Sequence, residues 1–252
     1  MFTLLNLLIA ASLFGIMIAL QEAGRRLGER DRLGHAENDQ GASAAEAAVY
    51  GLLGLIIAFT FSGAGARYEA RHRLLVDEAN AIGTAWLRLD LLPTSAQPQL
   101  RDLFRRYVDL RIDSARTPLG NQETMTKTLD LQTQIWSSAA AAAKESNQIA
   151  PNTVLLPALN AMIDITTTRE QAKWLHSPAA VFILLGVLSL TGSLFAGYDL
   201  AGKPRHWLHT LGFAAVLSLA LFVIIDYEFP RLGFIRVDEA DSALIDLRRS
   251  MQ

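Results

Sequence analysis

The stretch AAVYGLLGLIIAFTFSGAGA, residues 47–66, holds twenty consecutive positions without a charged side chain. At about 1.5 Å per residue, a helix of this length spans the roughly 30 Å hydrocarbon core of a bilayer. Residues 1–20, 178–197 and 207–225 repeat the pattern. Because only a helix satisfies the backbone polar groups of such a stretch in lipid, the sequence predicts an all-α membrane protein with four transmembrane helices.

Composition narrows the class of protein further. The 252 residues carry a formal net charge of −2 and no cysteine. A nucleic-acid-binding protein would need a clustered basic excess, so we expect no nucleic-acid partner. Disulfides and thiolate metal sites are excluded. The sequence shows no nucleotide-binding loop, metal-spaced histidine pair or nucleophile elbow, so we predict no enzymatic activity and no cofactor.

The first apolar stretch has two interpretations, an uncleaved span or a secretory signal. It lacks a Lys or Arg before its apolar core and is longer than a typical signal core, so we favour the span. Spans 1 and 2 then lie within residues 1–66, joined by an external loop over residues 21–45. Spans 3 and 4 lie within residues 178–226.

Between the two pairs of spans we predict a helical domain, residues 67–177, and after them a C-terminal tail, residues 227–252. Four spans place the domain and both termini on the same side of the membrane. The arginines and lysines that flank the spans are nearly balanced between the two sides. The positive-inside rule therefore does not decide which side is cytoplasmic.

The domain shows apolar positions at helical spacing and no strand-like alternation. Its first helix continues the second span as far as Pro93, and two more cover residues 97–115 and 121–146. A fourth begins near Pro151, and Pro157 should kink or restart it. Arg111, on the second of these helices, is expected to be exposed.

The second span is rich in small residues, including four glycines between positions 51 and 65. One interpretation is close helix packing, which small residues permit. The other is that several copies of this span converge around an axis and line a pore. In that case we expect the lumen to be lined by Ile56, Phe59, Thr60, Ser62 and Gly63.

Two arginines follow this span. Arg67 and Arg71 lie four residues apart and therefore share a helix face. Juxtamembrane arginines commonly anchor a helix at the lipid headgroups. Around a pore, the same side chains would form a positive ring at its inner mouth and concentrate anions.

The sequence FTFSGAGARYEARHRLLVDEANAIG, residues 59–83, resembles the signature of the bestrophin family. In that signature the second span ends in a Phe-containing stretch, followed by an Arg, an aromatic residue and Glu-Ala/Gly-Arg. Residues 67–71, RYEAR, match it, with one residue between Arg67 and Glu69 where the family usually has two. VDEANAIGTAWLRLDLLP, residues 76–93, and PRLGFIRV, residues 230–237, are similar to a bacterial bestrophin-like family.

This resemblance implies a fold and a function. Bestrophins are pentameric anion channels, so we expect a homo-oligomer, a pentamer, in a bacterial inner membrane, with the helical domain and both termini in the cytoplasm. The apolar constriction of the family's pore implies Ile56 and Phe59 here. The expected partners are copies of the same chain, membrane lipid and inorganic anions.

Other ionisable side chains are weaker candidates for a functional site. Glu46, His209 and Asp226 lie at the ends of spans, where an interfacial position is favoured over a buried proton site. An acidic cluster after the last span resembles a calcium site but lacks the glycine turn and carbonyl spacing of a calcium loop. We therefore predict a solvated helix start and no metal site at Asp238, Glu239 and Asp241.

The leading hypothesis is a homo-oligomeric channel permeable to anions such as chloride, with the second span lining the pore. Its rival is a non-conducting scaffold or sensor whose helical domain binds a partner. A secondary transporter would have broken spans and intramembrane charges at matched positions in its two halves. Those features are absent from the sequence, so this hypothesis ranks last.

Overall fold

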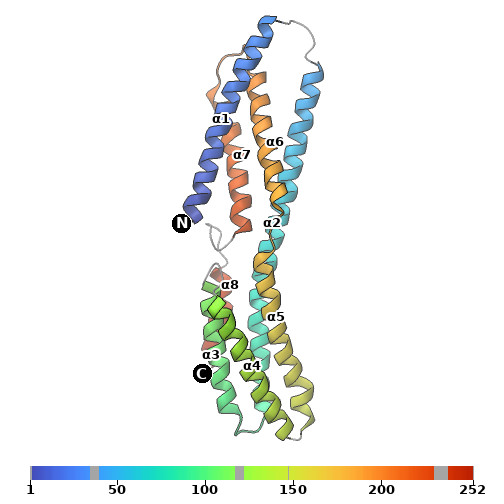
Figure 1. Cartoon of the computed structure of the whole chain (residues 1–252), viewed down its shortest axis with the longest axis vertical. Helices are drawn as coiled ribbons and strands as arrows, with labels where there is room; N and C mark the ends of the chain where they lie inside the picture. The colour runs from blue at the N-terminus through green and yellow to red at the C-terminus, as the bar shows by residue number, and fades with distance from the viewer. Residues whose placement is uncertain (1, 35–39, 117–121, 147, 230–237, 252) are drawn as a thin grey trace. The chain divides into compact units, whose positions relative to one another are not determined.

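The computed structural model describes residues 2–34, 40–116, 122–146, 148–229 and 238–251, and every regular element within them is a helix (Figure 1). Four helical stretches are long and apolar enough to cross a membrane. They overlap α1 (Phe2–Gly34), α2 (Gln40–Arg88), α6 (Ala179–Asp199) and α7 (Trp207–Glu228). The predicted all-α fold with four apolar spans is confirmed.

The chain forms two compact units. The membrane unit is drawn from Met1–Tyr68 and His176–Ile235 and holds α1, the first part of α2, α6 and α7. The helical unit is drawn from Glu69–Leu175 and Arg236–Gln252. It holds the rest of α2, η1 (Leu89–Leu91), α3 (Gln97–Arg116), α4 (Gln122–Glu145), η2 (Pro151–Leu155), α5 (Leu156–Trp174) and α8 (Asp238–Ser250).

Prolines divide the helical unit much as the sequence indicates. A 3₁₀ turn, η1, follows α2 ahead of Pro93, and α3 and α4 begin and end within one residue of the predicted ranges. Pro151 opens a π-helical turn, η2, which continues directly into α5. Pro157 lies just after this π-helical turn, where the continuous helix changes from π to α geometry.

Two segments differ from the loop and tail expected of them. Residues 21–45 are mostly helical, because α1 continues to Gly34 and α2 begins at Gln40. The C-terminal α8 packs into the helical unit, where Leu244 and Met251 are buried and Arg248 pairs with Asp109 on α3. The PRLGFIRV segment and the side chains of Asp238, Glu239 and Asp241 lie outside the described residues.

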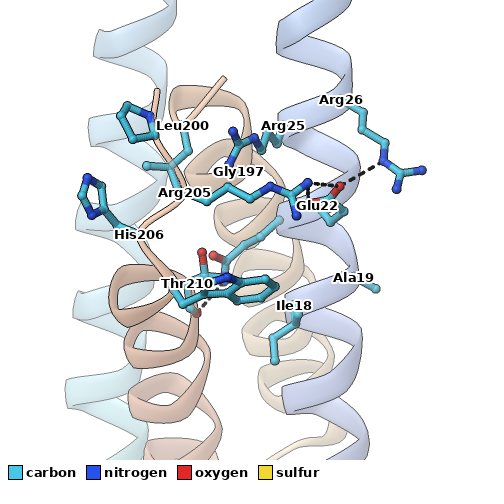
Figure 2. Close-up of a pocket in the computed structure, with 13 residues that line it drawn as sticks. Ile18, Ala19, Glu22, Arg25, Arg26, Gly197, Leu200, Arg205, His206 and Thr210 are labelled. Atoms are coloured by element: carbon cyan, nitrogen blue, oxygen red, sulfur yellow. Dashed lines mark hydrogen bonds and ion pairs between the residues drawn. The ribbon is translucent and has the colours of Figure 1, made fainter. Parts of the chain in front are cut away.

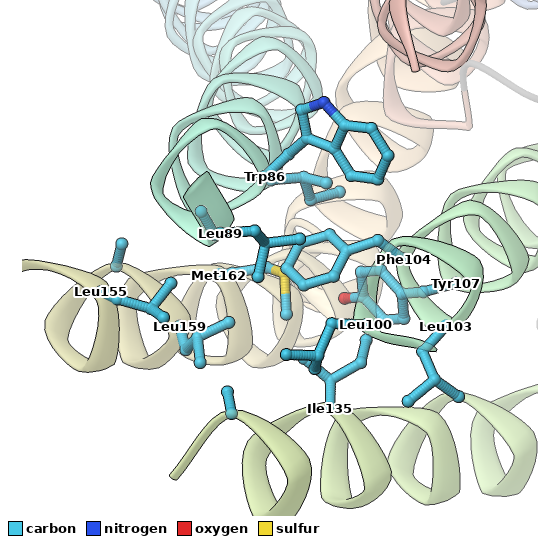
Figure 3. Close-up of a cluster of buried hydrophobic side chains, with 14 of the residues drawn as sticks. Trp86, Leu89, Leu100, Leu103, Phe104, Tyr107, Ile135, Leu155, Leu159 and Met162 are labelled. Carbon is cyan, nitrogen blue, oxygen red and sulfur yellow. The ribbon is translucent and has the colours of Figure 1, made fainter. Parts of the chain in front are cut away.

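The core of the helical unit combines aromatic and aliphatic side chains from α2, α3, α4 and α5 (Figure 3). Trp86 and Phe104 pack edge to face, with ring centroids 6.1 Å apart. The buried hydroxyl of Tyr107 lies 2.9 Å from the Thr166 hydroxyl and accepts a bond from the Gln132 amide at 3.1 Å. The hydroxyl groups of Tyr107 and Thr166 are thus paired, as burial requires.

Arg111 corrects a prediction, because it is buried rather than exposed. Its Nε donates to Oε1 of Glu78 at 2.5 Å, and Arg169 donates to the other carboxylate oxygen. Burial alone would raise the pKa of Glu78, but the two guanidinium groups hold that pKa below its usual value. Glu78 therefore stays ionised inside the helical unit.

In the membrane unit, α1 packs against α6 and α7 (Figure 1). At the crossing of α1 and α6, a Cβ on Gly24 would lie 2.0 Å from the carbonyl oxygen of Leu194. A Cβ on Gly197 would lie 1.9 Å from the carbonyl oxygen of Gln21. The two backbones are therefore in direct contact, a packing mode suited to helices in lipid.

Gly197→Ala should separate α1 from α6, because the added methyl group has no space beside a backbone carbonyl. Overpacking of this kind destabilises by about 1–3 kcal/mol, so we expect the midpoint of thermal unfolding in detergent to fall by about 5 °C. Gly186→Ala on the same helix is the control, since its Cβ would meet nothing within 4 Å. Equal midpoints for the two variants, measured by circular dichroism, would contradict the close crossing.

Candidate functional site

The site residues predicted from the sequence lie on α2 in the membrane unit. Phe59 is 67% exposed, and Ser62 is exposed as well. Ile56 and Gly63 are half-buried, and Ile56 packs partly against the core of the membrane unit. Thr60 is buried, and its hydroxyl donates to the carbonyl oxygen of Ile56 at 2.7 Å. The five residues therefore do not form one exposed face in the single chain.

A small-residue stripe, defined as Gly51, Gly54, Ala58, Ser62 and Gly65, runs along α2. Its members follow one another at intervals of three or four residues, so they share one helix face. For the three glycines, an added Cβ would meet nothing within 4 Å. Among the described glycines, α1, α6 and α7 each hold one position of this kind, whereas α2 holds three.

These glycines need a physical reason, because glycine inside a helix destabilises by about 0.5–1 kcal/mol relative to alanine. At the α1–α6 crossing the reason is visible, since another backbone lies against the glycine. In the described part of the chain nothing approaches the glycines of the stripe. The stripe therefore has the composition of a packing surface and no neighbour within the chain.

An ion pair lies where the membrane part of α2 ends. Arg67 donates from Nε to Oε1 of Glu228 at 3.1 Å and from Nη2 to Oε2 at 2.8 Å. Glu228, at the end of α7, is fully buried and also accepts from the backbone N–H of Ser177 at 2.6 Å. The Ser177 hydroxyl lies 2.5 Å from Nη2 of Arg67. The pair joins α2 to α7 and to the segment before α6.

This pairing bears on the charge expected of Arg67. A bidentate bond between an arginine and a carboxylate is strong, and in it the positive charge is balanced by the negative one. A ring of Arg67 side chains, each with its own Glu228, would carry little net charge. The charge of Glu228 therefore weakens any effect of Arg67 on passing ions.

Arg71 belongs to the helical unit and contacts the end of α5. Its Nε donates to the carbonyl oxygen of Ala172 at 3.1 Å, and its Nη2 donates to that of Leu175 at 2.7 Å. The last carbonyl groups of a helix lack intrahelical partners, and a basic side chain there satisfies them. In the single chain Arg71 thus caps α5.

The remaining candidate residues, at the ends of the spans, differ in their burial. Glu46 and Asp226 are buried within the membrane unit, whereas His209 is exposed. Their interfacial position remains a prediction. Among the described residues, no group of three or more His, Asp or Glu side chains is arranged to hold a metal ion.

The Arg67–Glu228 pair was missed by the sequence reasoning, yet a signal for it exists. Arg67 immediately follows the second apolar stretch, and Glu228 follows the fourth by three residues. Both spans end on the same side of the membrane by parity, so two opposite charges are brought to the same depth. An unsatisfied charge at that depth is expensive, which favours pairing.

Comparison with known proteins gives consistent results. Residues 25–242 match the protein-family model described as Bestrophin-like domain. A crystal structure of a variant of a bacterial bestrophin homologue from Klebsiella pneumoniae has a TM-score of 0.70 and 13% identity, over 95% of this chain and 98% of that one. A crystal structure of a variant of a membrane protein has a TM-score of 0.68 and 12% identity, over 93% and 98%. No curated protein sequence matches the chain.

Arg67→Met should destabilise the protein far more than Arg73→Met. The first change leaves the fully buried Glu228 without its bidentate partner, and breaking such a pair costs about 3 kcal/mol or more. Arg73 forms a solvent-exposed pair with Glu69 on the same helix, and water and salt screen such a pair so that its loss changes stability little. Thermal unfolding in detergent measures both, and similar midpoints would show that the Glu228 pair is dispensable.

Proposed function

We propose that this chain, which belongs to the Bestrophin-like family and is a multi-pass membrane protein, forms a homo-oligomeric ion channel whose pore is lined by α2. The observation that carries the proposal is the small-residue stripe of α2, which is exposed except for the half-buried Gly65, with the exposed Phe59 beside it. A single copy of four helices cannot enclose a hydrated path. The stripe supplies a surface on which copies of α2 can approach one another.

Identical copies that meet through a head-to-tail contact form a closed ring when the rotation closes. In such a ring, one side of α2 packs on the chain's own helices through Leu53 and Ile56. The opposite side carries the stripe and Phe59 toward the axis. We propose that the ring is a pentamer, as the family resemblance implies.

Phe59 is the proposed narrow point of the pore. A ring of phenyl groups excludes water from a narrow passage, and ions that must keep their hydration shell are then blocked. Ile56 packs against the hydrophobic core of the membrane unit, and the Thr60 hydroxyl donates a hydrogen bond to the carbonyl oxygen of Ile56 on the same helix. Ser62 and Gly63 lie about one helical turn after Phe59. Their small size would leave the pore wider there.

The finer features of the proposal rest on the family resemblance. We propose permeation of anions such as chloride, a bacterial inner membrane as the location, and a cytoplasmic position for the helical unit and both termini. Arg67 can favour anions at the inner mouth only to the extent that Glu228 does not cancel its charge.

Copies of α2 should be close enough to cross-link through the stripe. The chain contains no cysteine, so Ala58→Cys introduces a single thiol, and oxidation should join copies because disulfides need Cα atoms within about 7 Å. Val216→Cys, on an exposed position of α7, is the control and should form no disulfide between copies. Non-reducing electrophoresis separates the outcomes. No cross-link, together with a native mass of 27.6 kDa in detergent, would exclude the ring.

Phe59→Ala should raise single-channel conductance, because removing the phenyl group widens and wets the narrow point. We expect at least a twofold increase in planar bilayers, and a reversal potential in a chloride gradient that indicates anion selectivity. Ile183→Ala, on an exposed position of α6, should leave conductance unchanged. Absence of conductance in the unmodified protein would favour the scaffold hypothesis, and a cation-selective reversal potential would refute only the anion assignment.

A further inference from the structure

A pocket of about 370 Å³ lies at one end of the membrane unit, between α1 and the turn that joins α6 to α7 (Figure 2). Its walls come from residues 18–26 of α1 and residues 197–210. No residue of α2 lines it. The proposed pore and the Arg67–Glu228 pair therefore do not account for this pocket.

The pocket is basic at one side. Arg25, Arg26 and Arg205 line it together with a single carboxylate, Glu22. Oε1 of Glu22 accepts from Nε of Arg26 at 3.1 Å and from Nη2 of Arg205 at 3.1 Å, so two arginines share one negative charge. Arg25 donates to Glu29 and to the carbonyl oxygen of Lys203, which fixes its guanidinium at the rim.

Arg205 has donors left over for a ligand. Among the described residues only its Nη2 donates a hydrogen bond, to Glu22. The planar guanidinium fork matches the oxygens of a phosphate, and arginine is suited to bidentate phosphate recognition. Arg25 is paired with Glu29, and Arg26 and Arg205 share Glu22, so three positive charges meet two negative ones at the pocket. This excess positive charge favours a phosphate-bearing anion.

The opposite side of the pocket is apolar. Ile18, Ala19 and Trp207 line it, and they belong to the ends of two apolar spans. Figure 2 shows Ile18 and Ala19 one turn along α1 from Glu22, on the side of the span. Tryptophan is enriched where a span meets the lipid headgroups. The pocket thus changes from apolar to basic along the direction in which a phospholipid changes from acyl chain to headgroup.

We propose that this pocket binds the phosphate of an anionic phospholipid, with the phosphate on the arginines and the glycerol and first acyl carbons against Ile18 and Trp207. Inorganic phosphate would meet the same arginines but has no apolar part to occupy the other side. The inference does not depend on ion conduction and would hold for a non-conducting protein.

The test uses full-length protein in a mild non-ionic detergent and phosphatidylglycerol with brominated acyl chains, because bromine quenches tryptophan fluorescence at short range. The quenching due to Trp207 is the difference between the unmodified protein and Trp207→Phe. We expect phosphatidylglycerol to quench at a several-fold lower mole fraction than brominated phosphatidylcholine. Arg205→Gln should weaken phosphatidylglycerol quenching about tenfold, as expected for one lost charge-assisted bond. In this variant Glu22 keeps Arg26 as its partner.

Arg30→Gln is the matched control, because it removes the same charge from exposed α1 surface outside the pocket. It should quench like the unmodified protein. Equal quenching by the two lipids, or no effect of Arg205→Gln, would reduce the site to general lipid contact and overturn the proposal. If millimolar inorganic phosphate protects the unmodified protein against heat but not Arg205→Gln, while neither lipid shows preference, the anion is free phosphate and the lipid assignment is refuted.

Discussion

Backbone contact between α1 and α6 at Gly24 and Gly197 is the constraint on which the membrane unit depends. In lipid, an apolar side chain gains little by leaving one apolar environment for another, so helices associate through close packing and polar bonds. The contact also sets the position of the turn after α6, where Gly202 adopts a φ of 69°. That turn brings the Lys203 carbonyl and Arg205 to Arg25 and Glu22. The close packing of α1 and α6 at these two glycines thereby places the residues of the basic pocket.

In both units, buried ionic contacts join distant parts of the sequence. In the membrane unit Arg67 meets Glu228, and in the helical unit Glu78 lies between Arg111 and Arg169. Glu170 contacts Arg111 at 3.5 Å and also pairs with Lys173 at 2.7 Å, so three basic groups meet two carboxylates in this cluster. Isolated buried charges are strongly unfavourable, so these contacts fix which helix faces meet. They specify the arrangement more than they add to its stability.

The sequence predicts the elements of this fold better than their contacts. Span number, the all-helical domain and the ends of α3 and α4 follow from local signals, namely apolar length, periodicity and proline. The prediction that Arg111 is exposed is wrong, because local sequence places a charged residue at the surface. Its buried partner Glu78 lies 33 positions away and gives no local signal. Thr60 illustrates a related limit, because the rotation of α2 about its axis is set by packing. A mid-helix threonine can satisfy its hydroxyl on its own helix, so its chemistry does not reveal where it points.

Glycine on α2 connects the fold with the proposed assembly. At the α1–α6 crossing, the structure shows why glycine is needed, since a methyl group would strike a carbonyl oxygen. Gly51, Gly54 and Gly65 carry the same helix penalty on one face and meet nothing in the described chain. A neighbouring copy of α2 is the simplest partner, because head-to-tail packing of identical subunits around an axis brings copies of this helix together. The glycines at the α1–α6 crossing thus have a neighbouring helix, whereas the α2 glycines have none in the described chain. They lie on the side of α2 where Phe59 is exposed.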